Sequence, residues 1–188
     1  VFARENSRTM AVSAPLLQLG IKGQPAEGGA AQLRQRLLGE LACEALAGNS
    51  SPLYNRLYEK GLINSSFYLG YMDYPGCAFL VAGGETKDPE GVRDAILQEG
   101  KRIAEEGMEE AFFQRLKKAA YGAYVRGLNS FETLCVEQAQ GYFAEQNPWT
   151  FPEIYDALTR QDVEEFLRVW IKPEQTSLIV IWPEEAGK

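Results

Sequence analysis

Residues 50–67, SSPLYNRLYEKGLINSSF, change from a helical to an extended pattern within one short stretch. Ser51 is a typical helix-capping residue, and Pro52 suits the first helical position because its missing N–H would have no partner there. Leucines and tyrosines then recur at a spacing of four, which places them along one side of a helix. Gly61 is expected to end this helix, and a strand is expected to begin near Ser65.

The rest of the sequence extends this alternation of helices and strands. Apolar or alternating segments predict four strands in all: one over residues 10–22, one in each half of residues 64–86 around the turn DYPG, and one over the β-branched run TSLIVIWP at 176–183. The last run is typical of an interior strand. Helical spacing and capping residues predict helices over 30–48, 88–107, 109–128, 131–146 and 159–171.

This order of elements predicts an α+β fold. We expect a two-layer α/β sandwich, with a mainly antiparallel sheet and helices packed on one face. Residues 1–8 are polar and charged and are expected to be the end of a linker, which leaves residues 9–188 as a single domain.

Composition excludes several classes of function. The net charge of −7 argues against a nucleic-acid partner, and no apolar run reaches the length of a membrane span. Cys43, Cys77 and Cys135 are odd in number and far apart, so we expect three reduced core thiols in a cytoplasmic protein. The chain has no histidine, so it cannot by itself form a zinc hydrolase site of the usual kind, a Ser–His–Asp triad or a Cys–His pair.

The segment SPLYNRLYEKGL, residues 51–62, resembles the signature of the pitrilysin/insulinase metallopeptidase superfamily, which includes the mitochondrial processing peptidases. In that superfamily, a motif of the form Ser-x-Leu-[Phe/Tyr]-x-x-Leu-Arg-Glu-Lys-x-Gly-Leu-x-Tyr joins a helix to a hairpin. The order of elements over residues 12–183 is similar as well. One type of family domain carries a His-x-x-Glu-His zinc motif, and a second, degenerate type lacks it. A chain without histidine looks like the second type, the C-terminal non-catalytic domain of a processing-peptidase-like protein.

The resemblance also suggests candidate site residues. The non-catalytic domain of active members contributes an arginine and a tyrosine that reach the substrate. In this sequence those positions fall on Tyr58 and near Asn64, so both family residues are replaced. Arg56, Tyr54 and Tyr68 are the alternatives at neighbouring positions, and we take Arg56, Tyr58 and Asn64 as substrate-binding candidates. The alternative is that this helix only packs its tyrosines on the hairpin.

The resemblance implies a partnership rather than an independent enzyme. We expect no cofactor in this domain, no catalytic residue and no metal ligand. Zinc, where present, would belong to a homologous domain of the same bacterial protein or of a companion subunit, and the pair would enclose a peptide or an unfolded protein. The alternative is a stand-alone interaction domain that forms a homodimer or belongs to a protein-modification complex and has no role in proteolysis.

Overall fold

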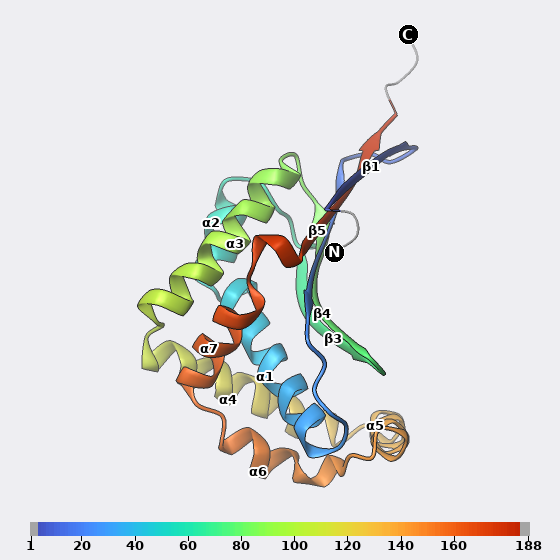
Figure 1. The fold of residues 1–188 in the computed structure, drawn as a ribbon, viewed down its shortest axis with the longest axis vertical. Helices are drawn as coiled ribbons and strands as arrows, with labels where there is room; N and C mark the ends of the chain where they lie inside the picture. Colours follow the sequence, from blue (N-terminus) through green and yellow to red (C-terminus); the bar gives the residue numbers. More distant parts are fainter. Residues whose placement is uncertain (1–3, 185–188) are drawn as a thin grey trace.

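The structure is a computed structural model that describes residues 4–184, and it contains one five-stranded sheet in the order β1-β5-β2-β4-β3 (Figure 1). The strands are β1 (Glu5–Met10), β2 (Leu16–Gly23), β3 (Tyr68–Tyr74), β4 (Cys77–Glu85) and β5 (Thr176–Pro183). Only β1 and β5 pair in parallel, and the other neighbours are antiparallel. The predicted α+β class, the mainly antiparallel sheet and the interior position of the last strand are confirmed.

One face of the sheet forms the core. Along β2, Leu17, Leu19 and Ile21 are buried, while Gln18 and Lys22, which alternate with them, are exposed. This alternation follows from the two-residue period of a strand, which directs successive side chains to opposite faces. Buried residues of β4 and β5 lie opposite those of β2 in the register, and the helices close the core over them.

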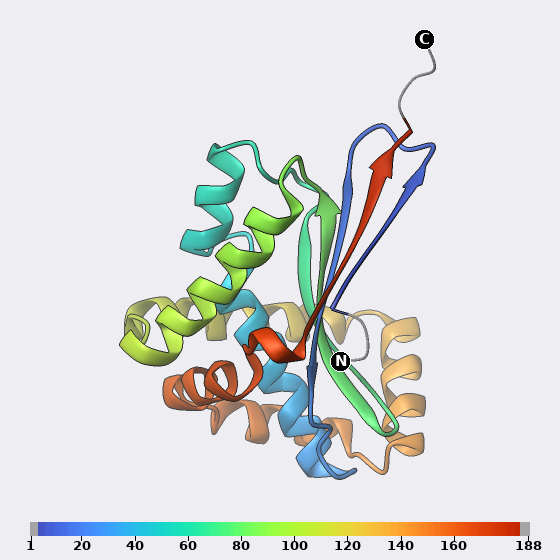
Figure 2. The same ribbon diagram turned by 45° about the horizontal axis from the view of Figure 1, so that its top comes forward.

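Helices form the second layer of the sandwich (Figures 1 and 2). They are α1 (Ala30–Ala47), α2 (Pro52–Glu59), α3 (Pro89–Glu106), α4 (Glu110–Gly127), α5 (Phe131–Phe143), α6 (Phe151–Asp156) and α7 (Arg160–Trp170), with short 3₁₀ turns at Pro148–Thr150 and Pro173–Gln175. Helix α5 lies next to the tip of the β3–β4 hairpin, away from α2, α3 and α7. No helix within residues 4–184 is long and apolar enough to cross a bilayer.

Local signals place several helix starts as predicted. The Asp88 side chain accepts a hydrogen bond from the backbone N–H of Gly91 at 2.9 Å, and Pro89 takes the first helical position of α3. Thr159 and Asp162 form a reciprocal capping box at the start of α7. These bonds satisfy backbone donors that have no partner inside the helix.

Two boundaries at the N-terminus differ from the prediction. The strand expected over residues 10–22 begins only at Leu16, and Met10 ends a separate strand. The assignment of residues 1–8 to a linker is wrong for residues 5–8, which belong to β1 and pair with β5, and residues 1–3 of that segment lie outside the described residues. All six side chains of β1 are exposed, so backbone pairing with β5, rather than an apolar pattern, holds this segment.

Gly84 in β4 gives the first testable prediction. Its φ is +148°, and a Cβ atom there would lie 2.8 Å from the Cα of Phe67. Gly84→Ala is therefore expected to cost about 2 kcal/mol of the free energy of unfolding, because it adds backbone strain to a clash with main-chain atoms. Urea denaturation measures this cost. Gly20→Ala in β2 is the matched control because a Cβ there meets nothing within 4 Å, and equal losses in the two variants would contradict the prediction.

Candidate functional site

Helix α2 carries two of the three candidate residues, and its boundaries follow from the sequence. The Ser51 hydroxyl accepts a hydrogen bond from the backbone N–H of Tyr54 at 3.1 Å, which caps the helix. Leu53 and Leu57 are buried and fix the helix on the core. Gly61 adopts a φ of +63° just after the helix, a conformation that favours glycine. The predicted helix and its end at Gly61 are confirmed.

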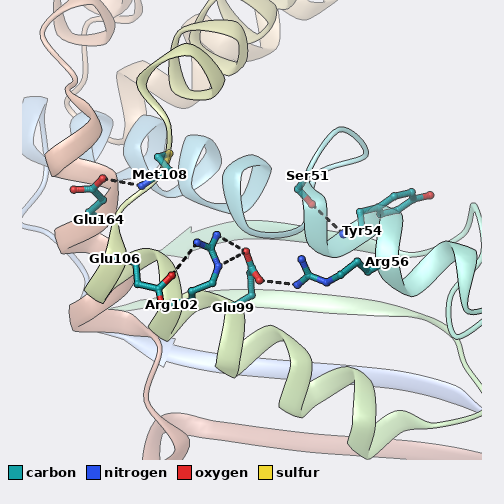
Figure 3. Close-up of polar contacts among 8 residues, drawn as sticks. All are labelled: Ser51, Tyr54, Arg56, Glu99, Arg102, Glu106, Met108 and Glu164. Carbon is teal, nitrogen blue, oxygen red and sulfur yellow. Dashed lines mark hydrogen bonds and ion pairs between the residues drawn. The ribbon is translucent and has the colours of Figure 1, made fainter.

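Arg56 points from α2 toward α3, where it meets a buried carboxylate (Figure 3). Its Nη2 atom lies 2.7 Å from Oε2 of Glu99, and Arg102 binds the other oxygen of Glu99 at 2.7 Å. The Glu99 side chain is only 5% exposed, and Arg102 also pairs with Glu106 at 3.5 Å. Two arginines from different helices therefore share one carboxylate.

The electrostatics of Glu99 follow from these partners. Burial alone raises the pKa of a carboxyl group, because it disfavours the charged form. The hydrogen bonds from Arg102 and Arg56, together with their positive charges, outweigh burial, and the pKa of Glu99 is lowered. Glu99 is thus an ionised structural link between α2 and α3.

Tyr58 and Asn64 lie apart from this link. Tyr58 is half-exposed and stacks on Tyr54, with ring centroids 5.9 Å apart. Asn64 lies in the loop before β3, where its Nδ2 donates to Glu85 at 2.9 Å and its Oδ1 accepts from the backbone N–H of Ser66 at 2.8 Å. Across residues 4–184, no hydrogen bond or ion pair joins any two of the three candidates. Their role in substrate binding stays a prediction.

A cavity of about 640 Å³ lies between helices α1, α4 and α6 and strand β3, and the sequence pattern did not predict it. Its walls are apolar and aromatic, with three carboxylates among them. Burial raises the pKa of Tyr155 to about 12, so this hydroxyl stays neutral and donates to the backbone carbonyl of Lys117 at 3.3 Å. The aromatic and acidic lining residues are Tyr71, Tyr124, Phe151, Tyr155, Glu40, Glu44 and Glu137.

The cysteines do not supply a reactive centre. Cys43 is buried, and burial raises the pKa of its thiol. Cys77 is half-buried, and Cys135 is exposed. The expectation of three core thiols is therefore wrong for Cys135, because helix α5 buries almost none of its side chains. All three thiols are free.

The side chains present do not fit a zinc ion. The chain lacks histidine, and in the part that the structure describes, no group of three or more Cys, Asp or Glu side chains is placed to hold a metal. A zinc site of the His-x-x-Glu-His kind needs two imidazoles and a carboxylate around the metal. No catalytic step through a metal follows from this chain.

The face of the sheet opposite the helices is open and largely apolar. We call it the open sheet face; its apolar residues are Tyr68, Met72, Tyr74, Phe79, Val81, Ile179 and Ile181, and Gln18 and Lys22 of β2 lie on the same face. Tyr74 stacks on Phe79 with ring centroids 6.2 Å apart, and Met72 lies opposite Phe79 in the register. Apolar residues gathered on an exposed surface mark a site of interaction with another molecule or domain. Sequence alternation predicted the strands, but it left open which face the helices cover.

Known proteins are similar to this chain in sequence or in fold. The protein named uncharacterized zinc protease YmfH, from Bacillus subtilis, is 28% identical over 189 residues, which cover 98% of this chain and 43% of that protein. A structure described as an M16-like peptidase from Alicyclobacillus acidocaldarius superposes with a TM-score of 0.89 at 19% identity, covering 97% of this chain and 44% of that one. Pitrilysin superposes with a TM-score of 0.72 at 15% identity, over 98% of this chain and 20% of its own.

The chain thus spans less than half the length of each of these proteins. The family model described as the peptidase M16 inactive domain matches residues 6–120, from β1 through most of α4. That match covers the motif in α2, the hairpin and helix α3, which carry the resemblance seen in the sequence. The chain belongs to the family of peptidase M16 inactive domains.

Proposed function

We propose that this domain is the non-catalytic half of a bacterial pitrilysin/insulinase-like metallopeptidase. A homologous domain of the same protein or of a companion subunit carries any zinc, and the two domains enclose a peptide or an unfolded protein segment. Three free cysteines suit the reducing cytoplasm as the location.

The open sheet face carries this proposal. Helices cover only one face of the sheet, and the other presents Met72, Tyr74 and Ile179 with 43–52% of each residue exposed. A domain that functioned alone would leave this apolar surface in water. If the same surface forms one wall of a chamber, it contacts apolar side chains of an extended substrate. Burial of these apolar groups favours binding, which a polar surface would not provide. The length of the relatives supports the presence of a second domain.

The test uses the full-length parent protein. We expect zinc bound in the other half and cleavage of an unfolded peptide. Met72→Asp combined with Tyr74→Asp should raise the KM for that peptide about tenfold, because two apolar contacts are lost. Bound zinc, measured by atomic absorption, should not change.

Val169→Asp provides the matched control. Val169 is similarly exposed, at 47%, but it lies on α7 in the helical layer, so its KM should remain at the wild-type value. A parent protein that neither binds zinc nor cleaves peptides would contradict the proposal, and so would an unchanged KM in the open-face variant. An obligate homodimer of this domain alone would favour the stand-alone interaction domain instead.

A further inference from the structure

Helix α5 presents an apolar stripe to solvent. Phe131, Tyr142 and Phe143 are 82%, 80% and 84% exposed, the highest values among the large apolar residues of the described chain. They belong to a set of exposed positions that recurs with helical spacing along α5. We call this set the outer stripe of α5; it consists of Phe131, Glu132, Cys135, Val136, Ala139, Gln140, Tyr142 and Phe143.

The two sides of α5 are the reverse of those of an ordinary surface helix. Its outer stripe has one charged residue, Glu132, and six apolar or sulfur-containing residues, whereas the half-buried side carries Thr133, Glu137 and Gln138 beside a single large apolar residue, Leu134. A helix that contacts only its own domain normally turns its apolar residues toward the core and its polar residues toward solvent. The only fully buried residue of α5 is Gly141, where an added Cβ would lie 2.6 Å from the Pro148 side chain. The C-terminal end of the helix is therefore held by close packing of the Gly141 backbone, and most of its large apolar side chains take no part in the core.

The position of α5 matches this exposure. Both ribbon views place it next to the tip of the β3–β4 hairpin and away from α2, α3 and α7 (Figures 1 and 2). Phe143 and Gln140 line a cavity of about 760 Å³ together with Met72 and Tyr74 of β3. The outer stripe thus adjoins the open sheet face at its hairpin end.

We propose that the outer stripe of α5 is an interface that packs against the homologous domain of the parent protein. This inference rests on the proposed function, which requires that domain. Proteins similar to this chain carry more than half of their length outside the matched region, which is ample to supply such a partner. A stripe with a single charged residue is typical of a permanent interface, because permanent interfaces are nearly as apolar as the core of a domain. A substrate that must leave after each turnover fits such a surface less well.

Photo-crosslinking in the full-length parent protein tests the contact. p-Benzoylphenylalanine replaces Phe131, Tyr142 or Phe143 one at a time, and Val169 on α7 is the control position with 47% exposure. We expect crosslinks within the chain to the homologous domain at the three stripe positions, with a yield independent of protein concentration, and none at Val169. Crosslinks between two copies, crosslinks only to an added peptide, or none at all would overturn the proposal.

Cys135 gives a second readout without any substitution, because it lies in the middle of the outer stripe and is exposed in this domain. In the native parent protein, Cys135 should react with iodoacetamide at least about tenfold more slowly than in urea, because the homologous domain covers it. Equal rates in native and denatured protein would overturn the proposed contact.

The two proposals can fail separately. Peptide cleavage and bound zinc are measured on the unmodified parent protein, and the crosslinks on the substituted one. Crosslinks to the homologous domain in a protein without zinc or cleavage would support the interface and reject the peptidase role. Cleavage that depends on the open sheet face, without crosslinks from α5, would support the peptidase role and reject the interface.

Discussion

Replacing Trp170 with alanine is expected to lower the free energy of unfolding by about 3–5 kcal/mol, the range for truncating a large aromatic residue in a core. Trp170 is 4% exposed at the end of α7. Its ring stacks on Phe166 at 4.6 Å and lies 5.6 Å from the ring of Tyr71 on β3. A Cβ on Gly23 of β2 would come within 2.3 Å of the same ring. Trp170 therefore joins α7 to two strands, and its removal leaves a cavity at their junction.

Urea denaturation of the chain, followed by circular dichroism, measures this loss. Trp149→Ala is the matched control, because Trp149 is 60% exposed and lies in a 3₁₀ turn. The control should change the free energy of unfolding by no more than about 0.5 kcal/mol, as is usual for surface positions. A loss below about 1 kcal/mol for Trp170→Ala would show that the packing around Trp170 does not hold the two layers together.

Elements with strong local signals could be predicted from the sequence. The run TSLIVIWP predicted an interior strand, and the DYPG turn predicted the hairpin. Strand β1, ENSRTM, has no apolar alternation and could not be predicted in this way. It becomes a strand only because the edge of β5 offers unpaired backbone groups, and that edge exists only in the folded domain.

In the candidate site, too, the local structure could be predicted from the sequence and the contacts between distant segments could not. The sequence placed Arg56 and Tyr58 on a helix, which is confirmed, but it gave no sign of the partner of Arg56. Glu99 lies 43 residues away, and the two meet only because α2 packs beside α3. Likewise, helical spacing predicted α5, but which of its sides faces the domain depends on the contact of Gly141 with the 3₁₀ turn that follows. Contacts between distant segments set both features.

Replacing both Arg56 and Arg102 with alanine is expected to lower the free energy of unfolding at pH 7 by about 3 kcal/mol, because it leaves the buried Glu99 carboxylate without a counter-charge. Both arginines are themselves 40–52% exposed, so the single variants should each lose only about 1 kcal/mol. Arg34→Ala, which removes a surface ion pair with Asp162 at 2.6 Å, should cost no more than about 1 kcal/mol and serves as the control.

Two further measurements separate a buried-charge penalty from a general loss of packing. Adding Glu99→Gln to the double variant removes the unpaired charge and should restore most of the lost stability. In the wild-type protein the pKa of Glu99 is lowered, so its stabilising contribution is present above pH 4.5, the ordinary value, and disappears as the pH falls through the lowered pKa. In the double variant burial acts unopposed and raises this pKa, so the difference in stability between the two proteins should shrink as the pH falls. A difference that stays constant with pH would mean that the arginines act through packing alone.

The same variants decide what Arg56 does in the parent protein. If Arg56 serves only to hold Glu99, Arg56→Ala should lower stability slightly and leave the KM for an unfolded peptide unchanged. If it binds substrate, as the motif in α2 suggests, the KM should rise while Arg102→Ala, which removes the other partner of Glu99, leaves the KM at its wild-type value. The hydrogen bond to Glu99 favours the first outcome, because it holds the Arg56 guanidinium at 2.7 Å against α3.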